Sequence, residues 1–146
     1  MQIEVNIDSS CHEPKIIILT ASMNDDVRNI IAKLSQDESQ IISGYRDKEV
    51  ERLDPSEVIQ IYASSGKVLA ITDQGEYVLR FRLYELEKKL PASQFIRISN
   101  SEIINLKKVS HFDLNFTGTI CVKMVNGNTT YVSRRYVTKL KKALTL

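Results

Sequence analysis

The sequence predicts a mainly β domain of short antiparallel strands, preceded by a small α/β N-terminal extension. Three observations support this fold class. The chain has 146 residues, which suits one ordinary domain with a short appendage. From about residue 40, short apolar segments of strand length succeed one another, separated by turn signals such as Ser65-Gly66 and Asn126-Gly127. Longer helical periodicity is confined to three short segments.

Residues 1–45 form the predicted extension. The alternating segment 2–7 has the pattern of a half-buried strand, and the apolar segment 16–19 has that of a strand buried on both faces. Ser22 is a good N-cap and predicts a helix from residue 23 to residue 34. The apolar residues of this helix form one stripe that should cover a sheet: Val27, Ile30, Ile31 and Leu34. A unit of this size should pack on the rest of the chain.

Residues 46–146 form the predicted second domain. One helical turn is expected at 54–57, a short helix at 83–90 that Pro91 ends, and a basic helix at 134–144. Strands are expected at or near 41–45, just before this boundary, and within the domain at or near 50–53, 58–63, 67–72, 77–81, 95–98, 103–104, 109–112, 120–125 and 129–132. Short strands with little helix therefore dominate this part of the chain.

Charge is unevenly distributed along the chain. Residues 1–45 carry three basic against seven acidic residues, a net charge of −4, whereas residues 101–146 carry eight basic against two acidic residues, a net charge of +6. A basic end attracts polyanions such as nucleic acid. The alternative is that these lysines and arginines only keep an amphipathic helix solvated.

Several protein classes are excluded. The sequence has neither an apolar stretch of about 18 residues nor a secretory signal, and its two cysteines, Cys11 and Cys121, suit a reducing cytoplasm. His12 and His111 lack partners at metal-ligand spacing, and glycine-rich phosphate loops and nucleophile motifs are missing. We therefore expect no enzyme activity, no cofactor and no metal site.

Polar and basic residues near the carboxyl end suit the recognition of DNA. Asn105 has the donor and acceptor that match adenine, and Arg135 has two parallel donors that match guanine or grip a phosphate. Alternatively, Asn105 caps a turn, and Arg134 and Arg135 only solubilise the start of a helix. The lysines would neutralise phosphates without reading sequence: Lys107, Lys108, Lys139, Lys141 and Lys142.

Two long patterns resemble the LytTR family of bacterial DNA-binding domains. They are FIRISNSEIINLKKV at 95–109 and VNGNTTYVSRRYVTKLKKAL at 125–144, and residues 53–91 resemble the opening strands and middle helix of the same domain. The resemblance covers about residues 46–146. It implies an elongated arrangement of short antiparallel strands whose loops, rather than a recognition helix, enter successive major grooves.

The resemblance also implies roles for single residues. Asn105, Arg135 and Lys67 stand at positions that contact bases. Asn100 stands where relatives commonly show Lys or His, and Arg97 either supports the structure or touches phosphate. The residues assigned to the DNA backbone are Arg97, Ser99, Asn100, Lys107, Lys108, Arg134 and Lys139.

The chain resembles the small one-component LytTR regulators, because 45 residues cannot hold a phosphoacceptor receiver domain. The resemblance implies double-stranded DNA with promoter repeats as the partner, a homodimer, and a small membrane protein that restrains the regulator; no small-molecule substrate is expected. Residues 1–45 would contact the dimer partner or the inhibitor, or would only support the sheet. A protein-interaction module whose basic end binds an acidic partner is the alternative function.

Overall fold

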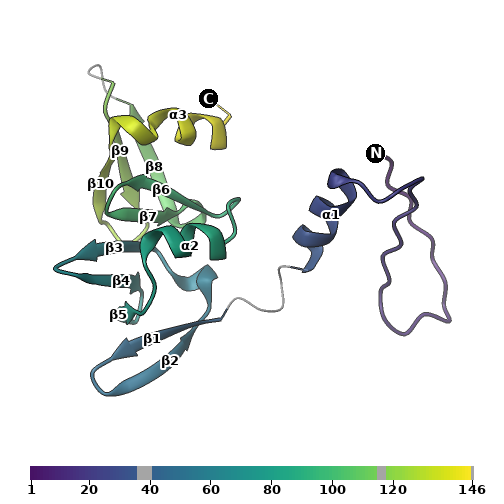
Figure 1. Ribbon diagram of the computed structural model, residues 1–146, viewed down its shortest axis with the longest axis horizontal. Coiled ribbons are helices and arrows are strands. Elements are labelled where there is room, and N and C mark those ends of the chain that lie inside the picture. Colours follow the sequence, from purple (N-terminus) through teal and green to yellow (C-terminus); the bar gives the residue numbers. More distant parts are fainter. Residues whose placement is uncertain (36–40, 115–117, 146) are drawn as a thin grey trace. The chain divides into compact units, whose positions relative to one another are not determined.

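A computed structural model describes residues 1–35, 41–114 and 118–145 of the chain (Figure 1). The chain divides into two compact units, residues 1–36 and residues 37–146. Among the described residues, the second unit contains all the strands and two of the three α-helices.

The first unit contains the predicted helix, here α1 (Asp25–Ser35). Its N-cap is Asn24 rather than the expected Ser22, because the Asn24 side chain accepts a hydrogen bond from the backbone N–H of Val27 at 3.0 Å. Asp25 and Asp26 in the first turn complement the helix dipole.

The strands predicted at 2–7 and 16–19 are not formed, so that part of the prediction is wrong. Neither segment pairs with another strand among the described residues, and Ile3, Val5 and Ile7 are 86%, 79% and 97% exposed. The physical reason is that apolar alternation shows which side chains could be buried together but supplies no partner for the backbone N–H and C=O groups.

The second unit is built on two antiparallel sheets in its described residues. One has seven strands in the order β2-β1-β5-β4-β3-β7-β6, and the other has three in the order β10-β9-β8. The strands are β1 (Ile42–Arg46), β2 (Glu49–Leu53), β3 (Gln60–Ser64), β4 (Lys67–Thr72), β5 (Gly75–Leu79), β6 (Phe95–Ser99), β7 (Glu102–Asn105), β8 (Val109–Leu114), β9 (Ile120–Met124) and β10 (Thr129–Val132). The mainly β prediction, with little helix, is confirmed.

Short helices connect the strands where the sequence predicts them. Asp54 caps a 3-10 turn, η2 (Pro55–Glu57), by accepting from the Ser56 backbone N–H at 2.9 Å. Helix α2 (Leu83–Lys89) ends before Pro91, and α3 (Arg134–Ala143) follows β10. A further 3-10 turn, η3 (Leu106–Lys108), follows β7, directly after the possible turn cap Asn105.

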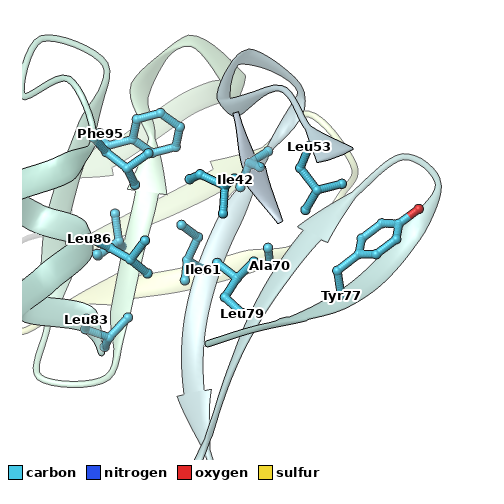
Figure 2. Packing of buried hydrophobic residues seen from close by; sticks show 12 residues of the cluster. Ile42, Leu53, Ile61, Ala70, Tyr77, Leu79, Leu83, Leu86 and Phe95 are labelled. Atoms are coloured by element: carbon cyan, nitrogen blue, oxygen red, sulfur yellow. The ribbon is translucent and has the colours of Figure 1, made fainter. Parts of the chain in front are cut away.

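Strands β6 and β7 are buried on both faces, because a hydrophobic core lies on each side of them. On one side Phe95 and Ile103 pack with Leu86 of α2 and with the large sheet, as Figure 2 shows for Phe95 and Leu86. On the other side lie residues of β6 and β7, the three-stranded sheet and α3: Ile96, Ile98, Ile104, Ile120, Val122, Met124, Val132 and Leu140. This sandwich fixes the turn between β6 and β7 rigidly.

Gly44 in β1 lies where the backbone approaches its neighbours closely. A Cβ atom at this position would lie 2.6 Å from Leu53 Cδ1 and 2.9 Å from Tyr77 Cβ. Because Leu53 and Tyr77 are core residues, neither can move away without disturbing the packing of the sheet.

We predict that Gly44→Ala lowers the free energy of unfolding by about 1–3 kcal/mol, since the added methyl group overpacks the core. Urea denaturation measures the loss. The exposed neighbour Ser43 is the matched control, and Ser43→Ala should change stability by less than about 0.5 kcal/mol. Equal effects of the two substitutions would contradict the close approach at Gly44.

Candidate nucleic-acid interface

Three segments from distant parts of the chain meet beside the turn between β6 and β7. The backbone N–H of Ala63 in β3 donates to the Ser101 carbonyl at 2.8 Å, which holds the β3–β4 hairpin against this turn. On the other side, the Ser133 N–H donates to the Ile98 carbonyl at 2.9 Å, and the Tyr136 hydroxyl donates to Asn100 Oδ1 at 3.1 Å. The turn is therefore the middle member of a row of three exposed segments.

The Arg97 side chain stabilises the β6–β7 turn by hydrogen bonds to its backbone carbonyls. Its Nε donates to the Ser99 carbonyl at 3.0 Å, and its Nη2 donates to the Asn100 carbonyl at 2.6 Å. Its Nη1 pairs with Glu87 of α2 at 2.6 Å, and the Arg97 side chain is only 18% exposed. Of the two roles considered for Arg97, the structure supports the structural one.

Asn105 is fully buried, so the base contact predicted for it does not fit the structure. Its Nδ2 donates to the Val58 carbonyl at 2.7 Å, and its Oδ1 accepts from the Lys107 N–H at 3.0 Å, which caps η3. With no exposed surface and both ends of the amide engaged, Asn105 cannot face a base edge in this conformation. The alternative role, capping a turn, is the one observed.

Asn100 is the exposed asparagine of this region. It lies at the tip of the β6–β7 turn between Ser99 and Ser101, and no bond to its Nδ2 is found among the described residues. From the sequence, only a backbone contact is expected for Asn100. The signal that could have separated the two asparagines is their flanks: Asn100 has a serine on each side, whereas Asn105 lies in the apolar run Ile103 to Leu106.

Arg134 and Arg135 are exposed in the first turn of α3. Cations at a helix N-terminus oppose the helix dipole, so these two arginines do not stabilise α3 electrostatically. Together with the positive end of the helix dipole, they favour the approach of an anion. The hydrogen bonds of Ser133 and Tyr136 tie this end of α3, which carries Arg135, to the β6–β7 turn.

Lys67 occupies the opposite end of the row. Ser65 and Gly66 both adopt positive φ angles, 51° and 77°, as a two-residue type I′ hairpin turn requires. Ser64 pairs with Lys67 in register, so the exposed Lys67 is the first residue after the turn. Lys67 and Arg135 therefore flank the Asn100 turn on its two sides.

The remaining predicted residues are more dispersed. Ser99 is half-buried within the turn, and its hydroxyl accepts from the Ser101 N–H at 3.2 Å. Lys139 lies one helical turn beyond Arg135, is 59% exposed and approaches Glu87 Oε2 at 3.6 Å. Lys107 and Lys108 lie in η3, at the other end of β7 from Asn100 and about 15 Å along the strand. The structure thus separates these two lysines from the row.

A polar network of side chains crosses between the two sheets. Asn128 Nδ2 donates to Gln60 Oε1 at 2.9 Å, and Glu102 lies beside Gln60 and Thr130. Burial raises the pKa of the Glu102 carboxyl, while hydrogen bonds from Thr130 and Gln60 partly lower it. Glu102 Oε2 is buried without a hydrogen-bond partner among the described residues.

Metal-binding clusters and membrane-spanning helices are both missing from the described ranges. No group of three or more His, Cys, Asp and Glu residues there could hold a metal ion. None of the helices in the same ranges is long and apolar enough to cross a bilayer.

The model of the LytTr DNA-binding domain family matches residues 48–145, about two thirds of the chain. The chain belongs to this family. The match contains all three segments of the row, so the row lies within a DNA-binding domain.

Relatives extend the similarity over the whole chain. Uncharacterised HTH-type transcriptional regulators of Staphylococcus aureus strains NCTC 8325 and COL are each 37% identical over 147 residues, covering 100% of this chain and 99% of each relative. The LytTr DNA-binding domain of a protein described as a methyl-accepting/DNA response regulator from Bacillus cereus shares the fold, with a TM-score of 0.71 and 22% identity. That similarity covers 74% of this chain and 99% of the other.

The name "HTH-type" carried by the staphylococcal relatives does not describe the helices seen here. A helix-turn-helix joins two helices by a turn of three or four residues. In the described part of the chain, α2 and α3 are separated by β6 to β10. The described helices therefore do not form a helix-turn-helix.

We predict that Asn105→Ala lowers the free energy of unfolding by about 1–3 kcal/mol, because it leaves the buried Val58 carbonyl without its donor and removes the cap of η3. Urea denaturation measures this loss. Asn100→Ala removes one exposed bond only and should cost less than about 1 kcal/mol. The reverse order would contradict the different placements of the two asparagines.

We predict that Glu102→Gln raises Tm at pH 7 and changes it little at pH 4. The raised pKa means that the folded state holds the Glu102 proton more tightly than the unfolded state does. This tighter proton binding stabilises the folded state fully at pH values below the ordinary carboxyl pKa. The stabilisation is lost as the pH rises through the raised pKa of Glu102. Thermal unfolding at both pH values tests this, with the exposed Glu49→Gln as the control.

Proposed function

We propose that this protein is a cytoplasmic transcription regulator that binds double-stranded DNA sequence-specifically through Lys67, Asn100 and Arg135. The observation that carries the proposal is that the β6–β7 turn is bonded on one side to β3 and on the other to α3. The three exposed side chains, which we call the tips of the row, are thereby held in the order Lys67, Asn100, Arg135 within a DNA-binding domain. We further propose that the DNA-binding domain comprises residues 46–146 and that residues 1–45 are an extension.

Each tip has chemistry suited to one kind of DNA contact. Arg135 can donate two parallel hydrogen bonds to guanine O6 and N7, and Asn100 can offer its Nδ2 to a base acceptor. Lys67, at the outer hairpin, adds a flexible donor and positive charge. Because Lys67 and Arg135 flank the turn, the two outer tips would enter successive grooves while Asn100 lies between them.

Other residues would support this contact without reading bases. Arg134 and Lys139 would neutralise phosphates near Arg135, and Lys107 and Lys108 would reach the backbone farther along the duplex. Asn105 and Arg97 act as positioning residues, since each holds backbone groups of the neighbouring turn. This assignment replaces the base contact first expected for Asn105.

The regulator would act as a homodimer on repeated promoter half-sites. A small membrane protein that restrains it, contacting residues 1–45, is supported by the family resemblance alone. The alternative function, capture of an acidic protein by the basic end, predicts no preference among DNA sequences. A comparison of selected with random DNA therefore distinguishes the two functions.

We predict different losses for the base-reading and the phosphate-contacting residues. A duplex is first selected from a randomised pool by the wild-type protein. Arg135→Ala and Asn100→Ala should each reduce affinity for the selected duplex about 5- to 150-fold more than affinity for random DNA, which corresponds to about 1–3 kcal/mol per base contact. The measurement is a fluorescence-anisotropy titration at fixed salt.

Lys141 is the matched control, because it is exposed on α3 and lies outside the proposed row. Lys141→Ala should weaken selected and random DNA alike and reduce the salt dependence. If Arg135→Ala and Lys141→Ala behave the same way, the base-reading role of Arg135 is wrong. A wild-type preference for the selected duplex below about tenfold would favour the acidic-partner alternative, since specific binding normally exceeds non-specific binding by about 10³-fold or more.

A further inference from the structure

The first unit exposes an unusual amount of apolar surface. Soluble monomers rarely expose contiguous apolar patches of more than a few hundred Å². Eight large apolar side chains of residues 1–23 are between 59% and 99% exposed: Met1, Ile3, Val5, Ile7, Ile16, Ile17, Leu19 and Met23. The stripe of α1 is only partly covered as well, because Val27 is buried but Ile31 and Leu34 are 42% and 49% exposed.

Segment 2–7 has the pattern of a strand but no strand partner within the described residues. The turn that follows this segment is held by hydrogen bonds within residues 8–11. Asp8 Oδ1 accepts from the Ser10 N–H at 2.9 Å and from the Ser10 hydroxyl at 2.7 Å, and the Cys11 N–H donates to the Asp8 carbonyl at 3.1 Å. The free backbone groups of residues 2–7 are therefore available to another strand.

We propose that residues 2–8 pair with the same residues of a second copy of this chain, as antiparallel strands related by a two-fold axis at Val5. In this register Ile3 lies opposite Ile7, and Val5 lies opposite Val5, so the three apolar residues share one face. Glu4 lies opposite Asn6 and Gln2 lies opposite Asp8, which keeps like charges apart.

The neighbouring registers are less favourable. A shift by one residue places apolar side chains opposite polar ones, because directly opposite residues share a face of the sheet. A register centred on Glu4 places Glu4 opposite Glu4, and one centred on Asn6 places Glu4 opposite Asp8. The register centred on Val5 therefore pairs all three apolar residues without placing like charges directly opposite each other.

The exposed area also fits a dimer. Full burial of such side chains removes about 60–120 Å² each from water, so Ile3, Val5 and Ile7 of the paired strands supply on the order of 200–350 Å² per copy. The other five exposed apolar side chains of residues 1–23 raise this to about 500–1,000 Å² if the same dimer covers them. A stable interface of standard size needs about 800 Å² per partner. The net charge of −4 over residues 1–45 disfavours an anionic lipid surface as the occupant. This inference does not depend on the DNA contacts of Lys67, Asn100 and Arg135.

Sedimentation velocity of the full chain across a concentration series tests the pairing. The wild type should dimerise at micromolar concentration, and Val5→Asp should weaken dimerisation at least tenfold, because it places two carboxylates opposite each other in an apolar row. Ser9→Asp adds the same charge outside residues 2–8 and should leave the dimer intact. A wild-type monomer, or a dimer insensitive to Val5→Asp, would overturn the proposal.

Disulfide cross-linking tests the register in the same full-length protein. Cysteines are introduced into a Cys11→Ser, Cys121→Ser background, so that the new thiol is the sole one. Directly opposite residues have Cα atoms about 4.5–5.5 Å apart, within the range of a disulfide. Val5→Cys should therefore give a reducible dimer several-fold faster than Asn6→Cys, whose opposite residue is Glu4. Equal or reversed rates would overturn the register.

DNA binding separates this inference from the proposed function. The monomeric Val5→Asp chain should bind a single half-site as the wild type does, and should lose only the added affinity for paired half-sites. Loss of single-site binding in this variant would mean that segment 2–8 supports the DNA-binding domain instead, and would overturn the dimer assignment.

Discussion

The burial of β6 and β7 between two hydrophobic cores is the constraint on which the rest of the second unit depends. Adjacent residues of these strands, such as Ile103 and Ile104, are fully buried on opposite faces. A turn carried by strands that are held on both sides has little freedom to move. Arg97 adds two hydrogen bonds to the backbone of that turn, and its pair with Glu87 joins the turn to α2.

This rigidity explains how a surface without a long recognition helix can present polar groups in a fixed arrangement. The preorganised tips need no ordering when a ligand arrives, so less binding free energy is lost to conformational entropy. The same construction requires polar groups to cross between the sheets. Gln60, Asn128 and Glu102 do so, and Glu102 carries an unpartnered oxygen as the cost of that position.

The two units differ in the exposure of their alternating apolar side chains. In the second unit, alternation in strands such as β9 corresponds to burial against α3 and β6, with Ile120, Val122 and Met124 almost fully covered. In the first unit, the same alternation at Ile3, Val5 and Ile7 corresponds to exposure. An alternating apolar segment that has no strand partner among the described residues is typical of an interface as well as of a core.

Local periodicity and turn residues were enough to predict most strand and helix positions from residue 42 onward. The family was indicated by the resemblance of two long sequence patterns, at 95–109 and 125–144. The exposed asparagine was identified from the fold instead, since Asn105 ends β7 and is buried with its Nδ2 bonded to the Val58 carbonyl, whereas Asn100 lies exposed in the β6–β7 turn. The fold likewise showed that Arg97 supports a turn and that segments 2–7 and 16–19 stay unpaired. Burial and strand pairing depend on residues distant in sequence, such as Val58 for Asn105, so the residues nearby in sequence determine them only in part.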